Sequence, residues 1–291
     1  MSDVLPAHRE HSRLFDDFQF VYPVISRRSG GLSIGLNVNP DKRCNFDCLY
    51  CQVDRSVPAP VLKFDVARAE VELRELLRAV EAGALAQHPR FADVPARLLR
   101  LKDIALSGDG EPTTLPEFAE AIAMIARVKP PRVKIVLISD AGGLDREDVK
   151  RGLTLMDANE GEVWAKLDAG TEEYFKFVNR TTVPFARVLK NITQCARERP
   201  LVIQSLFLKV HAKGPTAEEI VAYCDRLREI VVAGGRIKLV QVSTLARKAM
   251  TLVNQRPAWQ FVAALSAGEA GAIAAVVRGQ TGLTVESYPG V

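Results

Sequence analysis

Three cysteines lie close together in the first quarter of the chain: Cys44, Cys48 and Cys51, with the spacing C-x3-C-x2-C. A short loop with this spacing can place three sulfurs around one inorganic centre. Iron–sulfur clusters are normally held by four thiolates, and no fourth cysteine is nearby in the sequence. One iron would then keep an open coordination position, as a catalytic metal does when it binds a substrate. A zinc knuckle, or loop cysteines without a ligand, remain alternatives.

The composition around this loop is that of an ordinary globular protein. The chain has 291 residues, 47% of them hydrophobic and 25% charged. This length fits either two domains or one α/β barrel. The formal net charge of +4 and the pI of about 8.8 are compatible with a polyanionic partner.

The cysteine count and the N-terminal sequence indicate the cellular compartment. Five cysteines, three of them clustered, argue against a disulfide framework and for a reducing environment. Residues 1–18 form a polar arm of mixed charge, unlike a signal peptide. No apolar run approaches the ~20 residues needed to span a bilayer. We therefore expect a cytoplasmic protein with no membrane partner.

Strands and helices alternate along the chain about six times. The strands are expected at residues 32–38, 103–106, 133–139, 162–167, 202–210 and 237–242, with a short β-like segment at 283–286. The helices are expected at residues 66–82, 115–127, 146–156, 185–199, 217–232 and 267–279. Short connections between alternating elements favour parallel βαβ units. Six units are too few for an eight-fold barrel, so we predict an α/β fold with a partial, open (β/α)6 barrel and outer helices.

Polar residues follow several of these strands, at the end where parallel barrels collect their chemistry. The segment Gly108-Asp109-Gly110-Glu111 could bring backbone carbonyls close to a ligand and offer a carboxylate to an ammonium group. A purely structural turn is the alternative.

The other strand ends supply further candidates. Lys166 and Asp168 follow the fourth strand, and the lysine could pair with a carboxylate, form a Schiff base or extend into solvent. Ser139, Asp140, Gln204 and Arg247 end other strands and are assigned to ribose, cofactor or substrate contacts. Cys195 and Cys224 lie at apolar helix positions, which predicts buried small side chains rather than ligands.

The cysteine segment, with the aromatic Tyr50 just before its third cysteine, resembles the signature of the radical S-adenosylmethionine (SAM) enzymes. The resemblance implies that Cys44, Cys48 and Cys51 bind a [4Fe–4S] cluster whose open iron chelates SAM, and that Tyr50 lies against the adenine. Gly110 and Glu111 would match the element that holds the SAM ammonium group, although Asp109 stands where that element has a glycine. Lys166 and Asp168 would be polar SAM contacts. The implied chemistry is reductive SAM cleavage and hydrogen abstraction by a 5′-deoxyadenosyl radical, with an electron donor such as flavodoxin or ferredoxin.

Within this superfamily, several motifs look closest to the enzymes of tRNA wyosine synthesis. They are Ser26-Arg27-Arg28, the cysteine segment through Gln52, residues 108–113, residues 166–170 and Ala246-Arg247. This implies a tRNA base or nucleotide as substrate. However, no cysteine precedes Cys44, where that family has ligands for a second cluster, and Lys248-Ala249-Met250 lacks the expected prolines. A glycyl-radical-activating or peptide- or small-molecule-modifying enzyme is the alternative, and a non-catalytic iron–sulfur or zinc module is a third.

These motifs also suggest how the chain is divided. We expect a polar arm and lead-in at residues 1–31, a radical SAM core at 32–244, and a C-terminal extension packed on the core at 245–291.

Overall fold

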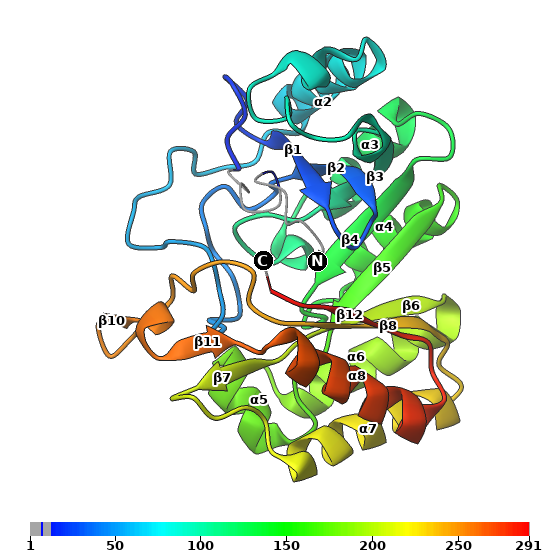
Figure 1. Cartoon of the computed structure of the whole chain (residues 1–291). Helices are drawn as coiled ribbons and strands as arrows, with labels where there is room; N and C mark the ends of the chain where they lie inside the picture. Colours follow the sequence, from blue (N-terminus) through cyan, green and yellow to red (C-terminus); the bar gives the residue numbers. More distant parts are fainter. Residues whose placement is uncertain (1–6, 8–12, 291) are drawn as a thin grey trace. The chain divides into compact units, whose positions relative to one another are not determined.

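The computed structural model describes Ala7 and residues 13–290 (Figure 1). The chain divides into two compact units that alternate along the sequence. The first unit contains the described residues up to 43, with residues 59–138 and 146–162, and the second contains residues 44–58, 139–145 and 163–290. Of the predicted polar arm, residues 1–6 and 8–12 lie outside the described part. The division into arm, core and extension stays a prediction.

The first unit contains four neighbouring strands. Their order is β1 (Val21–Ser26), β2 (Gly31–Leu36), β3 (Leu101–Leu106) and β4 (Lys134–Ser139). Its helices are α2 (Val66–Glu81), α3 (Phe118–Val128) and α4 (Glu147–Asp157), with single 3-10 turns at residues 84–87, 96–98 and 112–114. Strand β1 is antiparallel to β2, whereas β2, β3 and β4 are parallel. The carboxyl ends of β2 and β3 therefore meet at one edge.

Helix α2 shows how local sequence and packing combine in this unit. The side chain of Asp65 caps its N-terminus, and Leu73 and Leu76 are fully buried, as the helical periodicity predicts. Glu72 is buried on the same face, and its carboxylate accepts the backbone N–H groups of residues 19–21 at 2.9–3.2 Å. This acid therefore fixes the start of β1 to the helix.

The second unit contains four parallel strands and four helices. The strands are β5 (Gly161–Lys166), which begins in the first unit, then β6 (Leu201–Leu206), β8 (Ile237–Ser243) and β12 (Val285–Tyr288). The helices are α5 (Glu172–Asn179), α6 (Phe185–Glu198), α7 (Ala217–Val232) and α8 (Ala267–Thr281). Two small antiparallel ribbons join β7 (Leu208–Val210) to β11 (Val262–Ala264) and β9 (Leu252–Val253) to β10 (Arg256–Pro257), and a 3-10 turn spans Ala258–Gln260.

The α/β class with parallel strands and outer helices is confirmed, and all six predicted strand–helix units are present. The predicted strand at 202–210 is wrong as a single element, because it divides into β6 and β7 at Phe207. This side chain is fully buried, and its backbone N–H bonds to the carbonyl of Ser243. Cys195 and Cys224 are buried, as expected. Helix α5 and the short strands between residues 245 and 266 were not predicted.

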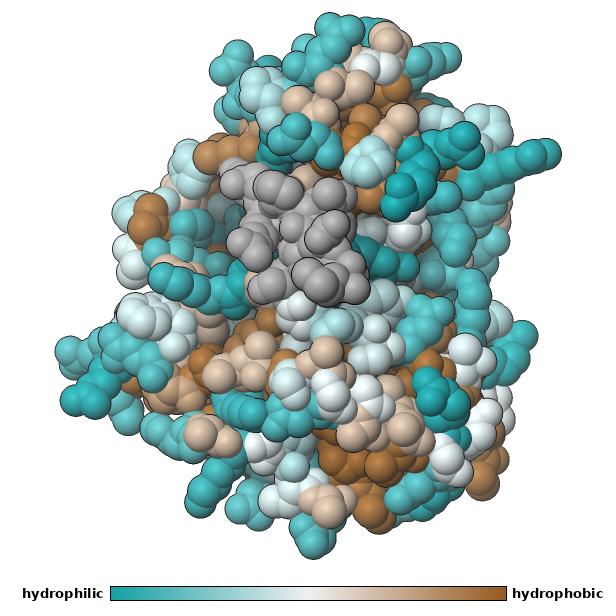
Figure 2. Space-filling view, in the orientation of Figure 1, coloured by the Kyte–Doolittle hydropathy of each residue, from teal (hydrophilic) through white to brown (hydrophobic). Residues whose placement is uncertain are grey.

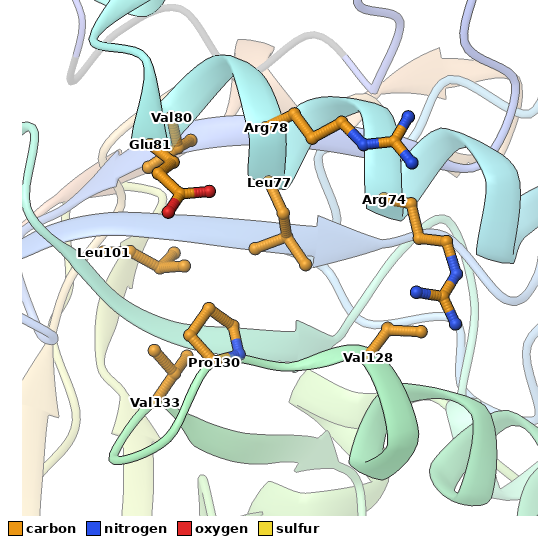
Figure 3. A pocket seen from close by; sticks show the side chains of 9 residues that line it. All are labelled: Arg74, Leu77, Arg78, Val80, Glu81, Leu101, Val128, Pro130 and Val133. Atoms are coloured by element: carbon orange, nitrogen blue, oxygen red, sulfur yellow. The ribbon is translucent and has the colours of Figure 1, made fainter.

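A pocket of about 420 Å³ lies in the first unit (Figure 3). Its lining side chains come from the end of α2, the end of α3 and the amino ends of β3 and β4: Arg74, Leu77, Arg78, Val80, Glu81, Leu101, Val128, Pro130 and Val133. The candidate site residues follow the carboxyl ends of strands. Since parallel α/β folds place their chemistry at that end, we assign this pocket no part in catalysis.

Two surface features concern possible partners. No helix within residues 13–290 is long and apolar enough to cross a membrane. Exposed valines gather on two helices of the second unit, with Val221, Val231 and Val232 on α7 and Val276 on α8. Figure 2 shows hydrophobic surface in the region where Figure 1 places these helices.

Candidate functional site

The cysteine loop is held by the C-terminal end of α5. The N–H of Asp47 donates to the carbonyl of Asn179 at 3.2 Å, and the N–H of Leu49 donates to the carbonyl of Val178 at 2.8 Å. The ring of Phe46 meets that of Phe175 edge-on, with centroids 5.7 Å apart. Carbonyl groups at the end of α5 thus accept hydrogen bonds from backbone N–H groups of a loop that has no regular secondary structure.

The last two cysteines of the triad are joined by a turn, and the three residues differ in exposure. The N–H of Cys51 donates to the carbonyl of Cys48 at 3.0 Å. Cys48 is buried, while Cys44 and Cys51 are partly exposed. Burial raises the pKa of the Cys48 thiol to about 11, although the positive charge of Lys166 opposes this rise.

The surroundings of the sulfurs suit an iron–sulfur cluster. Asn179 Nδ2 lies 3.5 Å from Cys48 Sγ, and an Arg55 N–H donor lies 3.2 Å from Cys51 Sγ. Donors of this kind stabilise thiolate ligands and adjust the potential of a cluster. Among residues 13–290, no three His, Cys, Asp or Glu side chains converge on a point that could hold one metal ion. A cluster does not require such convergence, because each thiolate binds a different iron.

A buried polar network connects this loop to the end of β5. The hydroxyl of Tyr50 donates to Asp168 Oδ2, and Asn179 Nδ2 donates to the same oxygen at 2.9 Å. Lys166 Nζ lies 3.7 Å from that oxygen and 4.3 Å from the centroid of the Tyr50 ring. The other oxygen, Asp168 Oδ1, accepts the N–H of Leu206 at 2.9 Å. Asp168 is therefore the centre of the network.

The network also keeps the Tyr50 hydroxyl protonated. Burial and the neighbouring Asp168 carboxylate raise the pKa of Tyr50 well above its ordinary value, so this phenol remains protonated and donates its hydrogen. The Tyr50 hydroxyl thus donates its hydrogen bond to Asp168. One face of the Tyr50 ring lies beside the Lys166 cation. Its predicted position against the SAM adenine stays a prediction.

Asn179 is a site residue that the sequence analysis missed. One amide nitrogen reaches Cys48 Sγ, Tyr50 Oη at 3.3 Å and Asp168 Oδ2. Its amide oxygen is buried and has no hydrogen-bond partner among the described residues. The signal that could have found it is the segment Thr171-Glu172-Glu173, an N-cap followed by two acids, which marks the start of α5.

We predict that Asn179→Ala keeps the cluster but shifts its midpoint potential to a more negative value, because one N–H donor to a ligand sulfur is lost. The lost hydrogen bonds should also lower the free energy of unfolding by about 1–3 kcal/mol. Spectroscopic redox titration measures the potential, and chemical denaturation measures the stability.

The matched control is Asn191→Ala. Asn191 is equally buried but donates to the carbonyl of Ala141 on a different loop. This variant should lose comparable stability and keep the potential. Equal potentials in wild type and Asn179→Ala would show that the Asn179 amide does not influence the cluster.

The Gly108–Glu111 turn belongs to the first unit and follows β3. A Cβ atom on Gly108 would lie 2.2 Å from Asn37 Oδ1, and one on Gly110 would lie 1.9 Å from the carbonyl oxygen of Arg43. Both glycines are therefore required for the turn to pack against the segment after β2. This segment leads directly into Cys44.

The departure at Asp109 has a structural explanation. Its carboxylate pairs with Arg13 Nε at 3.1 Å and accepts Asn37 Nδ2 at 2.9 Å. Arg13 also contacts the hydroxyl of Tyr22. Although burial opposes the charged form, Tyr22 and Asp109 raise the pKa of the Arg13 guanidinium. Asp109 thus connects the turn to the N-terminal segment and is less suited to bind a ligand.

Glu111 is buried and caps the short 3-10 turn that follows it. Its Oε1 atom accepts the N–H of Thr113 at 3.0 Å and the hydroxyl of Thr113 at 2.6 Å. The carboxylate is therefore held in one orientation by its own chain.

The remaining candidates occupy two places in the second unit. Ser139 Oγ accepts the N–H of Ala141 at 3.0 Å, and Asp140 Oδ1 accepts the N–H of Gly142 at 2.8 Å, so both shape the loop after β4. Gln204 pairs with Lys166 in the β5–β6 register and donates to Gln241 at 3.3 Å.

Arg247 reaches the cysteine loop directly. Its Nε atom donates to Gln52 Oε1 at 2.6 Å, next to Cys51 in the chain. The second unit thus brings Arg247, Tyr50, Lys166, Asp168 and the three cysteines into one continuous region, whereas residues 108–111 belong to the first unit.

Two curated proteins are similar to this chain in sequence. The chain is 28% identical over 163 residues to a UPF0026 protein of Methanocaldococcus jannaschii, covering 54% of this chain and 43% of that protein. It is 27% identical over 231 residues to a UPF0026 protein of Helicobacter pylori, covering 77% of this chain and 65% of that protein. The chain thus spans less than two thirds of the length of these relatives.

Solved structures show the same fold at low identity. A radical SAM methyltransferase from Sphaerobacter thermophilus matches 92% of this chain and 68% of its own, with a TM-score of 0.60 and 11% identity. A structure of TYW1 with a lysine–pyruvate adduct matches 86% of this chain and 74% of its own, with a TM-score of 0.51 and 12% identity. The predicted partial barrel is thereby confirmed.

The match to a family model shows which family the chain belongs to. The model of the radical SAM superfamily matches residues 38–211, which is more than half of the chain and includes the three cysteines, Tyr50, Lys166 and Asp168. Membership implies SAM and an iron–sulfur cluster as cofactors, and it implies a need for an electron donor. This chain belongs to the radical SAM superfamily of enzymes.

Proposed function

We propose that Cys44, Cys48 and Cys51 of the second unit would hold one [4Fe–4S] cluster, and that SAM would bind beside it. When bound, the cluster and SAM together supply a 5′-deoxyadenosyl radical for hydrogen abstraction from a substrate. The observation that carries the proposal is the buried network of Cys48, Tyr50, Lys166, Asp168 and Asn179, which places one N–H donor, from Asn179, and the cation of Lys166 near one ligand sulfur.

Within this proposal, Lys166 would hold the carboxylate of SAM as a fixed cation. Asp168 keeps the ammonium group of this lysine near the cysteine loop, and the Tyr50 ring shields it on one side. For the first unit, the likeness of Gly110-Glu111 to the ammonium-binding element of the family supports Glu111 as the group that would accept the ammonium of SAM. The role of these residues is to orient SAM and to exclude water from a reactive radical.

We predict that Glu111→Gln weakens SAM binding and leaves the cluster intact. The amide can still accept hydrogen bonds from Thr113, so the 3-10 turn should persist, whereas the charge-assisted bond to an ammonium group is lost. That loss should cost about 1.5–3 kcal/mol, or about ten- to a hundred-fold in affinity. Glu111→Ala should weaken binding at least as much, because the cap is also removed. Equilibrium dialysis with labelled SAM measures the dissociation constant.

Asp109→Asn provides the comparison for this measurement, because the Asp109 carboxylate is already paired with Arg13. We expect a change in SAM affinity of less than about threefold in this variant. If Asp109→Asn weakened SAM binding and Glu111→Gln did not, the ammonium site would have to be reassigned within the turn.

For the substrate, we propose a tRNA base or a nucleotide. The likeness to TYW1 and the mild basic charge support this class. The lysine–pyruvate adduct belongs to that TYW1 structure. Flavodoxin or ferredoxin would supply the electron.

Comparing the modified nucleosides of tRNA from cells with and without this chain tests the substrate class. A nucleoside that disappears with the chain would support it. Unchanged nucleosides, together with active SAM cleavage, would favour a glycyl-radical-activating or peptide- or small-molecule-modifying enzyme.

A further inference from the structure

One surface of the second unit combines positive charge with exposed aromatic rings. It consists of residues 208–216 and 245–268, which the β7–β11 ribbon joins (Figure 1), and we call it the β7–β11 surface. These segments contain five of the 39 Lys and Arg residues of the chain and none of its 35 Asp and Glu residues. The remainder of the chain is therefore close to neutral, and the net positive charge is concentrated here.

Most of these cations are available to a partner. Lys209 pairs with Glu269 at 2.8 Å, and Arg247 contacts Gln52. Lys213, Lys248 and Arg256 are exposed, and none of them is in an ion pair within the part of the chain that the structure describes. Exposed cations without nearby acids attract anionic groups.

An indole ring lies among these cations. Trp259 is 43% exposed, and Lys248 Nζ lies 5.1 Å from its ring centroid. The N–H of Trp259 donates to the carbonyl of Ala249 at 3.1 Å, which fixes the backbone that carries the ring. The nearby rings of His211 and Phe261 stack at 5.3 Å. An exposed flat ring beside cations can stack on an unpaired base while the cations bind phosphates.

The surface is continuous with the candidate active site. The N–H of Met250 donates to the carbonyl of Cys51 at 2.7 Å, and Thr251 Oγ1 donates to the carbonyl of Cys48 at 3.0 Å. A chain bound along this surface would therefore lead directly to the cysteine loop.

From these observations we propose that the β7–β11 surface docks an unpaired segment of RNA, with a base on Trp259 and phosphates on Lys248 and Arg256. The inference rests on the proposed tRNA or nucleotide substrate and specifies where the RNA strand of that substrate would bind. The cations alone would also suit an acidic electron-donor protein, but the exposed indole is the feature that favours a base.

The test uses the reconstituted holoprotein and a fluorescein-labelled single-stranded RNA of twelve adenosines, with anisotropy measured over a series of salt concentrations. Trp259→Ala should weaken binding about tenfold. Lys248→Ala/Arg256→Ala should lower the slope of log affinity against log salt by about 1.4. The matched control Arg97→Ala/Arg100→Ala removes two exposed arginines of the first unit and should change neither quantity.

Intrinsic fluorescence gives a second readout. The chain has two tryptophans, and Trp164 is buried in β5. Stacking of a base should quench the emission of Trp259, and Trp259→Phe should abolish this quenching while retaining part of the affinity. Quenching that persists in Trp259→Phe would contradict base stacking at this position.

Two results would overturn the proposal. One is RNA binding that is absent, or that is equally strong in wild type and in all surface variants. The other is loss of flavodoxin binding in Lys248→Ala/Arg256→Ala with RNA binding unchanged, which would assign the surface to a protein. Iron content and SAM affinity are measured on the same preparations, so failure of the cluster and SAM proposal would be recognised separately.

Discussion

Cys48→Ala should eliminate the iron–sulfur cluster. Wild-type protein reconstituted without oxygen should contain about four irons per chain, because the sequence has one cysteine triad. In the variant, one of three ligands is missing, and both iron content and the broad visible absorbance should fall close to background. The fold should persist, since Asn179 still donates to Asp168 and α5 still holds the backbone of the loop.

Cys224→Ala is the control for a general effect of removing a buried thiol. Cys224 is fully buried in α7, away from the cysteine loop in sequence, and its variant should retain about four irons. Retention of the cluster in Cys48→Ala would contradict the ligand assignment. About eight irons in wild-type protein would instead indicate a second cluster and renew the case for two-cluster wyosine chemistry.

Lys166 should tolerate arginine but not alanine. A fixed cation beside Asp168 and Tyr50 can be supplied by either basic side chain, so Lys166→Arg should retain substantial 5′-deoxyadenosine formation. Lys166→Ala should lose most 5′-deoxyadenosine formation because SAM binds more weakly. Loss of the charged contact should lower the affinity for SAM about ten- to a hundred-fold. Product assays at low and saturating SAM distinguish weaker binding from slower chemistry.

A covalent role for Lys166 makes a different prediction. A Schiff-base lysine cannot be replaced by arginine, because guanidinium does not form the adduct. Borohydride trapping of a carbonyl compound on Lys166, detected by peptide mass spectrometry, would overturn its assignment as a SAM contact. Such a result would move the protein toward pyruvate-dependent tRNA chemistry.

The sequence predicted the parallel α/β framework well, because the buried strands are apolar runs between amphipathic helices. Helix α7 has the predicted bounds, and α8 begins at the predicted residue, where Ser266 and Glu269 form a capping box. Strand β6 was predicted too long because Leu208–Val210 has β-type residues, yet these residues pair with β11, which is distant in sequence.

Site residues could be predicted where cysteine spacing or a position at the end of a strand identifies them. Contacts between residues that are distant in the sequence could not be predicted, because only folding brings them together. The cysteine triad, Lys166 and Asp168 could be chosen from the sequence. The sequence could not indicate that Asp168 accepts hydrogen bonds from Tyr50 and Asn179, which are separated from it by 118 and 11 residues. The ion pair between Asp109 and Arg13 could not be predicted either, because the two residues are 96 positions apart in the sequence.

Formation of 5′-deoxyadenosine tests the central claim most directly. Reconstituted protein, reduced with dithionite and supplied with SAM in the absence of oxygen, should release 5′-deoxyadenosine, detected by liquid chromatography and mass spectrometry. Cys48→Ala, treated identically, should give only the background level. If wild-type protein carrying about four irons per chain released no more 5′-deoxyadenosine than Cys48→Ala, the proposed SAM cleavage would be contradicted.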